Sequence, residues 1–206
     1  WHLLLQDENL YLTALYNKNG NLSTLNACLE NELAILDETA AFDGALFRES
    51  IDYHGFLPVW EAGDGNFTVK YREHLAKINT EGFGIFARSH VFTVDSTGHL
   101  VPVKHPDPQS LTALYGYEKE REKVIANTIA LLEGKPANNV LLYGDAGTGK
   151  SSTVKAVANA YRDRGLRLIE VKKNQLYLIP DLVDSLGSNP LKFILFIDDL
   201  SFSTND

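Results

Sequence analysis

The sequence contains one run whose residue types and spacing are those of a phosphate-binding loop. It matches the pattern G-x-x-x-x-G-K-[ST] in full. Glycines let a backbone turn with positive φ and approach a phosphate closely, and successive N–H groups then form a nest for anions. We expect the lysine to reach the outer phosphates of a nucleotide and the serine hydroxyl to bind Mg²⁺. The predicted binding segment is Gly144, Asp145, Ala146, Gly147, Thr148, Gly149, Lys150 and Ser151, followed by Ser152.

The residues on either side of this run provide the context that the pattern requires. Residues 140–143 are apolar and predict a short strand that ends just before Gly144. Residues 150–164 predict a helix that Gly165 ends, and the positive end of its dipole faces the loop. The alternative is a glycine-rich turn with no ligand, which this strand–loop–helix arrangement disfavours.

A second motif lies near the end of the chain, where the apolar residues 193–197 are followed by Asp198 and Asp199. An apolar strand that ends in an acid is the Walker B pattern. We expect Asp198 to hold Mg²⁺, mostly through water, opposite Ser151. Asp199 is the predicted catalytic base that polarises a water molecule, acting beside Lys150. Two alternatives for Asp199 stay open: a residue of the magnesium shell, or a capping residue.

The elements that must position these motifs follow a break at residues 105–108, which include two prolines. Helices are predicted at residues 117–133 and 180–186, in addition to residues 150–164. Strands are predicted at residues 166–171 and 193–197, in addition to residues 140–143. Apolar strands that alternate with helices predict an α/β fold with a parallel sheet and flanking helices. We therefore expect residues 109–206 to form one part of an ATPase-like module.

Residues 1–108 predict a separate, small α+β region. Leucines recur every three or four positions from residue 22 to residue 36, which indicates one face of a helix. A second amphipathic helix is predicted at residues 67–78. Residues 84–94 and 99–103 predict the two strands of a hairpin. Nothing in this region indicates chemistry, so it either recognises a partner or braces the rest of the chain.

Composition and charge exclude several classes of protein. Hydrophobic residues make up 44% of the 206 residues, and no apolar run approaches the roughly 18 residues of a membrane span. The single cysteine, Cys28, fits a reducing cytoplasm. The net charge is −8, with 7 Lys/Arg and 15 Asp/Glu in residues 1–108, so charge does not favour nucleic-acid binding. One exposed basic patch stays possible, at Arg162, Arg164, Arg167, Lys172 and Lys173.

The second half of the chain resembles the start of an AAA+ ATPase module. The resemblance is carried by Leu114-Tyr115-Gly116-Tyr117-Glu118, by Asn139-Val140-Leu141-Leu142-Tyr143-Gly144 with the loop, and by Asp198-Asp199-Leu200-Ser201-Phe202. It is closest to a poorly characterised bacterial AAA+ group known as a domain of unknown function. The final motif is also similar to the replication-initiator and helicase-loader branch. The resemblance implies that Gly116 and Tyr117 touch adenine.

The same resemblance implies a P-loop sheet of order 5-1-4-3-2. The chain stops before strand 4, so we expect it to be truncated after the Walker B strand and to be part of a longer protein. A gap should then separate residues 140–143 from residues 193–197.

The resemblance also implies the function. ATP and Mg²⁺ would be bound, and ATP hydrolysed to ADP, in a homo-oligomer that drives a conformational change in an unknown protein partner. Two alternatives are a nucleotide-dependent switch or adaptor with little turnover, and a helicase-loader-like protein. A third, a small-molecule kinase, is disfavoured by the Gly116-Tyr117-Glu118 segment.

Overall fold

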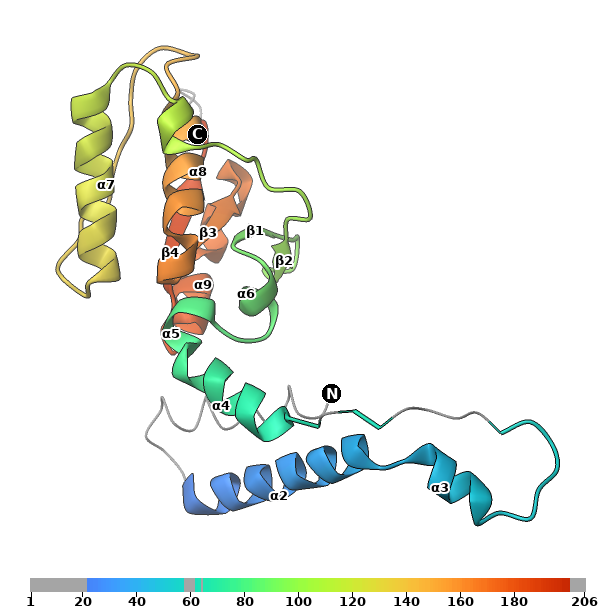
Figure 1. Ribbon diagram of the computed structural model, residues 1–206. Coiled ribbons are helices and arrows are strands. Elements are labelled where there is room, and N and C mark those ends of the chain that lie inside the picture. The colour runs from blue at the N-terminus through green and yellow to red at the C-terminus, as the bar shows by residue number, and fades with distance from the viewer. Residues whose placement is uncertain (1–21, 58–61, 64, 201–206) are drawn as a thin grey trace. The chain divides into compact units, whose positions relative to one another are not determined.

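The computed structural model describes residues 22–57, 62–63 and 65–200, and the chain divides into two compact units (Figure 1). The first unit is Trp1–Ala76 and the second is Lys77–Asp206. This division falls about 30 residues before the boundary that the proline-rich break predicts at residue 108. The two units are described separately below.

Within its described residues, the first unit is helical. It contains α2 (Leu22–Ala41), α3 (Gly44–Glu49) and α4 (Phe67–Ala76). The predicted leucine face is confirmed for Leu29 and Leu33, which are buried against a small apolar cluster formed by Leu36, Phe67 and Tyr71. The side chains of Leu22 and Leu25 lie outside the described residues. The Asp37 carboxylate accepts hydrogen bonds from the Thr68 hydroxyl (2.7 Å) and the Phe67 N–H (2.6 Å), so α2 caps the start of α4. These bonds, that of Thr68 first, lower the pKa of Asp37.

Within its described residues, the second unit is built on a sheet of four strands with the order β2-β1-β3-β4. The strands are β1 (Val91–Val94), β2 (Leu100–Pro102), β3 (Leu166–Val171) and β4 (Lys192–Ile197). β1 pairs in parallel with β3, and β3 pairs in parallel with β4, whereas β2 is antiparallel to β1. The predicted α/β class is therefore confirmed, but the sheet is mixed rather than purely parallel.

The hairpin β1–β2 explains why the units divide where they do. Phe92 lies opposite Ile169 in β3, and the Leu168 N–H donates to the His90 carbonyl (2.8 Å). The hairpin thus extends the sheet of the second unit rather than belonging to an N-terminal region. The predicted strand 84–94 is also shorter than expected, because Ile85–Arg88 forms the short helix α6 before β1 begins.

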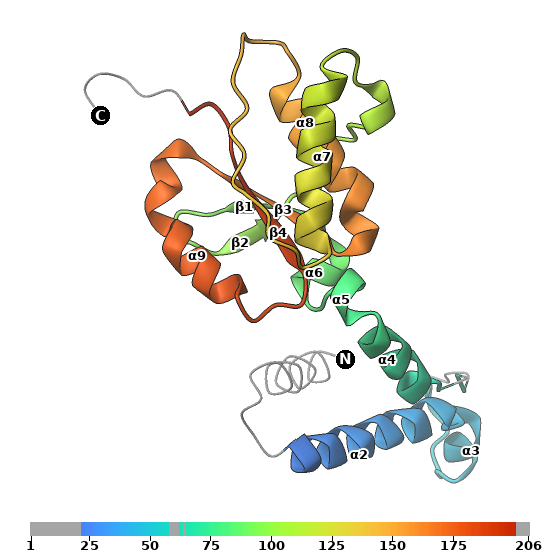
Figure 2. The same cartoon turned by 90° about the vertical axis from the view of Figure 1, so that its left-hand side faces the viewer.

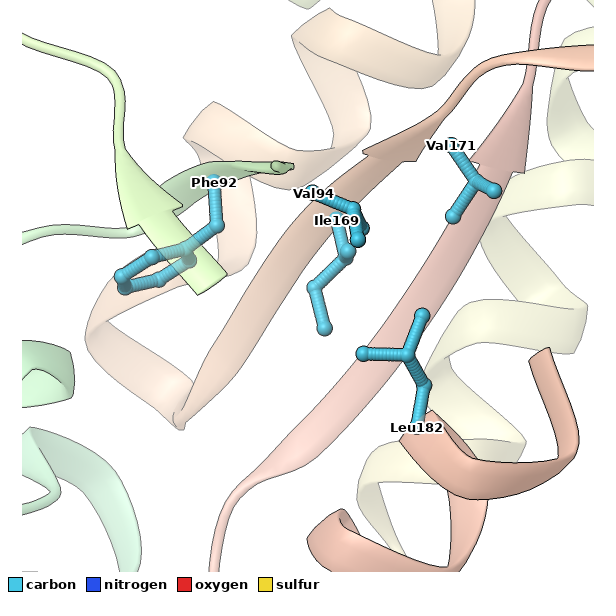
Figure 3. Packing of buried hydrophobic residues seen from close by; sticks show 5 residues of the cluster. All are labelled: Phe92, Val94, Ile169, Val171 and Leu182. Carbon is cyan, nitrogen blue, oxygen red and sulfur yellow. The ribbon is translucent and has the colours of Figure 1, made fainter. Parts of the chain in front are cut away.

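Helices cover both faces of this sheet (Figure 2). On one face α8 (Lys150–Tyr161) packs through Val154 and Ala158 against Val91 and Leu168. On the other face α9 (Ile179–Leu186) supplies Leu182 to a core that Figure 3 shows in detail. That core is formed by Phe92, Val94, Ile169, Val171 and Leu182. Neighbouring residues of β1 and β3 thus serve opposite faces, as the pleat of a strand requires.

The remaining elements connect these layers. They are α5 (Ile78–Glu81), η1 (Leu111–Ala113), α7 (Glu118–Leu132), η2 (Arg162–Arg164) and η3 (Lys173–Leu178). Gly165 joins η2 to β3 with φ +88°, and a Cβ there would lie 2.4 Å from the Asn79 carbonyl oxygen. Glycine is therefore required where α5 approaches this turn. No helix among the described residues has the length and apolar character to cross a membrane.

The strand predicted at residues 140–143 does not form. These residues have no regular secondary structure, and Val140, Leu141 and Tyr143 are 51%, 74% and 89% exposed. Among the described strands, β4 pairs only with β3, so residues 140–143 are not paired with it. Residues 140–143 pair with none of the described strands, so their backbone lacks the hydrogen bonds between strands that define a sheet.

The turn between β1 and β2 is held by the carboxylate of Asp95. Its Oδ1 accepts hydrogen bonds from the Thr97 hydroxyl (2.6 Å), the Thr97 N–H (2.8 Å) and the His99 N–H (3.0 Å). These bonds, that of the Thr97 hydroxyl first, lower the pKa of Asp95.

We expect Asp95→Asn to lower stability at neutral pH and to reduce the loss of stability in acid. A carboxyl with a lowered folded pKa stabilises the fold above its unfolded pKa of about 4, and this contribution is lost as pH falls through the folded value. Urea midpoints at several pH values between about 6 and 2.5 should therefore converge for variant and wild type at the acid end. Asp184→Asn removes one exposed carboxylate of α9 and serves as the control. A constant difference between Asp95→Asn and wild type would contradict the prediction.

Candidate functional site

The predicted phosphate loop lies at the N-terminus of α8 and has a backbone that only glycine adopts readily. Gly147 and Gly149 have φ of 79° and 80°, in the left-handed region. A Cβ added at either position would meet no atom within 4 Å, so the space beside them is open. The Thr148 hydroxyl donates to the Asp145 carbonyl (2.9 Å) and closes the loop on itself. The loop is thus a preformed turn that leads directly into a helix of twelve residues.

Lys150 turns its ammonium group into this loop. Its Nζ donates to the carbonyl oxygens of Gly144 (2.9 Å) and Asp145 (2.7 Å), and it lies 3.4 Å from the Thr148 hydroxyl oxygen. The side chain is half-buried, whereas residues 144–147 are exposed. The ammonium of Lys150 therefore lies within an exposed loop, beside the positive end of the α8 helix dipole. This arrangement favours the binding of an anion.

The two sequence motifs meet at a hydrogen bond between Ser151 and Asp198. The Ser151 hydroxyl donates to Oδ1 of Asp198 at 2.8 Å, although the residues are 47 positions apart. Asp198 follows the last residue of β4, and Ser151 is the second residue of α8. The same carboxylate oxygen accepts the N–H of Asp199 (3.0 Å), whose backbone is left-handed with φ 53°. A hydroxyl and a carboxylate, both exposed or half-exposed, thus face each other at the edge of the loop.

These oxygens fit a magnesium ion only in company with a ligand. Among the residues that the structure describes, no group of three or more His, Cys, Asp or Glu side chains could hold a metal. Mg²⁺ is usually bound by one or two carboxylates together with water and substrate phosphates, rather than by a cage of protein ligands. Ser151 and Asp198 match that incomplete set. The donor set therefore suits an ion that arrives with a phosphate.

Two other predicted binding residues, Gly116 and Tyr117, lie at the start of α7. Both are left-handed, with φ of 73° and 55°, and the Tyr117 side chain is 59% exposed. The Gly116 N–H donates to Glu118 (3.1 Å) and its carbonyl accepts from Arg121 (3.1 Å), which stabilises this bend. In the described part of the chain no hydrogen bond joins this bend to the phosphate loop. The connection runs instead through η1, which contacts α8.

The remaining predicted residues have simpler positions. Ala146 lies at the exposed tip of the loop, and Ser152 is half-buried in the first turn of α8. Asp199, the predicted base, is exposed beside Asp198. The structure thus brings together the loop, the Lys150 ammonium, the Ser151 hydroxyl and the two carboxylates that follow β4. Gly116 and Tyr117 connect to this site only indirectly, through η1.

Sequence reasoning missed two residues that the structure makes important. Arg167, which was expected in a possible exposed basic patch, is 5% exposed and belongs to the interior, so it cannot serve such a patch. Asn159, on α8, bonds to three separate positions of the chain. The signal for Arg167 was its place inside an apolar strand, and that for Asn159 was a polar residue directly after Ala156, Val157 and Ala158.

The second unit is thus an α/β domain with a glycine-rich loop between a coil and the helix α8. Residues 87–206 match the family described as "Protein of unknown function (DUF815)". This match covers more than half of the chain, so the chain belongs to that family. No curated protein and no solved structure matches the chain.

Proposed function

We propose that this chain binds ATP with Mg²⁺ as a P-loop ATPase of the AAA+ type. The observation that carries the proposal is the 2.8 Å hydrogen bond between Ser151 and Asp198, which joins the two motifs beside the loop that surrounds Lys150. This bond joins the helix that follows the loop to the acid that follows β4, although the two residues are 47 positions apart. Two independent motifs converging on one point are what nucleotide binding requires.

In this proposal each residue of the site has a distinct role. The backbone N–H groups of residues 144–149 and the Lys150 ammonium bind the phosphates of ATP or ADP. Ser151 and Asp198 hold Mg²⁺, which neutralises charge on the phosphates when bound. Asp199 accepts a proton from water. Gly116 and Tyr117 contact the base.

The sheet supports the AAA+ assignment in part. In the order 5-1-4-3-2, β4 and β3 correspond to strands 3 and 2, and the edge of β4 that no described strand pairs with is where strand 4 would lie. The hairpin β1–β2 adds to β3 on the opposite side and is an extension beyond that order. In this reading the chain is a cytoplasmic subunit of a homo-oligomer, and ATP turnover changes the conformation of a protein partner.

A second function, a nucleotide-dependent switch or adaptor with little turnover, is favoured by Asp199. Aspartate is one methylene shorter than the glutamate usual at this position in hydrolysing AAA+ proteins, and its left-handed backbone is rare for a residue other than glycine. If the Asp199 carboxylate does not reach the attacking water, the protein would bind ATP without hydrolysing it quickly. A helicase-loader-like role is a variant of either function.

The experiment is to measure ATP binding and ATP turnover by the whole protein, with and without Mg²⁺. We expect Asp198→Asn to abolish the magnesium dependence of binding, because the carboxylate is the anionic ligand of the ion. Asp199→Asn should leave binding within about twofold and lower turnover by about 10²-fold or more if Asp199 is the base. Glu120→Gln, on the exposed side of α7, is the control for loss of one acid.

The outcomes separate the two functions. Turnover that depends on Asp199 supports the ATPase. Tight binding with no turnover in the wild type supports the switch. A folded protein that binds no nucleotide contradicts both.

A further inference from the structure

Asn159 lies on the helix that carries the phosphate loop, nine positions after Lys150, and its side chain uses its hydrogen-bonding capacity almost fully. The amide nitrogen donates to the carbonyl oxygens of Asp107 (2.9 Å) and Gln109 (2.8 Å). The amide oxygen lies 2.9 Å from Nε2 of His90. The side chain is half-buried between α8 and the chain that precedes η1.

The partners determine the orientation of these groups. Carbonyl oxygens only accept hydrogen bonds, so the atom that faces Asp107 and Gln109 must be the amide nitrogen. The amide oxygen then faces His90, and Nε2 of His90 must carry the hydrogen. Three bonds from one side chain thus fix residues 107–109 to α8 and to the residue that precedes β1.

A second contact ties the same residues to the same helix. Lys155, one turn before Asn159, lies 4.0 Å from the Asp107 carboxylate and 3.6 Å from Glu170 of β3. From residue 109 the chain runs into η1, which Ser110 caps through the Thr112 N–H (3.3 Å) and which contacts α8. Gly116 and Tyr117 follow after Leu114 and Tyr115. The bend at these two residues therefore takes its position from α8 through residues 107–113.

One helix thus carries the phosphate loop at its start and the anchor of the Gly116–Tyr117 bend near its end. A helix is stiff along its axis, so the distance between the two is fixed by the fold. We propose that Asn159 is a positioning residue that holds this bend in register with the phosphate loop. Ligands that carry a nucleoside are thereby bound more tightly than bare polyphosphate. The inference rests on the proposed nucleotide site.

The test compares two magnesium-loaded ligands, ATP and inorganic tripolyphosphate, by isothermal titration calorimetry on the whole protein. Asn159→Ala should weaken ATP binding by about tenfold, the effect of losing one or two positioned hydrogen bonds. Binding of tripolyphosphate, which needs only the loop, should change by less than about twofold. Asn189→Ala, which removes an amide that accepts the Leu191 N–H in the loop before β4, is the control and should change neither.

The ratio of the affinities for ATP and tripolyphosphate distinguishes a positioning role of Asn159 from a general loss of stability. A role in stability alone would weaken both ligands together and leave the ratio unchanged, and that result would overturn the inference. If Asn159→Ala does not fold, Asn159→Ser, which keeps one donor, is measured in the same way. A wild type that binds tripolyphosphate as tightly as ATP also overturns the inference. A wild type that binds neither ligand overturns the proposed function instead.

Discussion

Replacement of Lys150 by alanine should lower ATP turnover by about 10²- to 10³-fold and weaken ATP binding by at least about tenfold. The ammonium of Lys150 is held inside the loop by Gly144 and Asp145, close to the exposed backbone where phosphates would lie. Alanine removes that charge and leaves the glycine turn in place. Binding is measured by titration calorimetry and turnover by release of phosphate.

Lys123→Ala is the matched control, because Lys123 is an exposed lysine of α7 outside the site. It should leave both quantities within about twofold. The melting temperature of Lys150→Ala should stay near that of the wild type, since the lysine bonds only within an exposed loop. Equal losses in the two lysine variants would refute the role of Lys150. Retention of full ATP binding in Lys150→Ala would refute the phosphate loop itself.

Replacement of Arg167 by leucine should destabilise the second unit by at least about 3 kcal/mol. The guanidinium is buried within the sheet layer and, among the described residues, donates to five backbone carbonyl oxygens and to no carboxylate. Those carbonyls belong to Thr80, Glu81, Phe86, Arg162 and Leu166. Burial lowers the pKa of Arg167, yet arginine stays charged at neutral pH. Leucine would remove the donor from these carbonyl groups, most of which are partly buried.

The loss is measured as the free energy of unfolding in urea and should be compared with two other variants. Arg167→Lys keeps the charge but offers three donors in place of five, so it should recover only part of the stability. Arg164→Leu removes an exposed arginine that stacks over Tyr161 at 5.7 Å, and its effect should stay below about 1 kcal/mol. Similar losses of stability for Arg164→Leu and Arg167→Leu would show that the buried guanidinium of Arg167 contributes nothing to the free energy of unfolding.

The consequence of losing Arg167 should be local at first. Three of its carbonyl partners lie in residues 80–86, before the start of the family match at residue 87. The hydrogen bonds of Arg167 therefore connect α5 and the start of α6 to β3. We expect hydrogen exchange in residues 78–88 to rise in Arg167→Lys, while β3 and β4 stay protected.

Those elements that depend on short-range patterns were predictable from the sequence. The prediction for β3 matches the observed strand, and β4 begins one residue earlier than expected at Lys192. Helix α7 ends at Leu132, and the Gly134 and Lys135 N–H groups after it bond back to Leu131 and Ala130, as the glycine indicated. Residues close in sequence determine these features, because the apolar period and the turn residues act within one element.

Elements that need a distant partner were not predictable in the same way. Residues 140–143 are as apolar as a strand, but no neighbouring strand pairs with them. The hairpin at residues 91–102 lies before the proline break, yet its partner β3 begins at residue 166. A sheet is held by hydrogen bonds between segments at any distance apart along the chain, so alternating polarity predicts a strand but not its neighbour.

The sequence by itself determined the loop: three glycines, a lysine and a serine at the start of a helix predict a turn for anions wherever the helix lies. Only the tertiary structure decided that Ser151 bonds to Asp198, that Asn159 bonds to residues 107–109, and that Arg167 is buried and bonds to backbone carbonyls rather than joining an exposed patch. Backbone conformation is set by residues a few positions apart, whereas the partner of a polar side chain depends on which segments the core brings together.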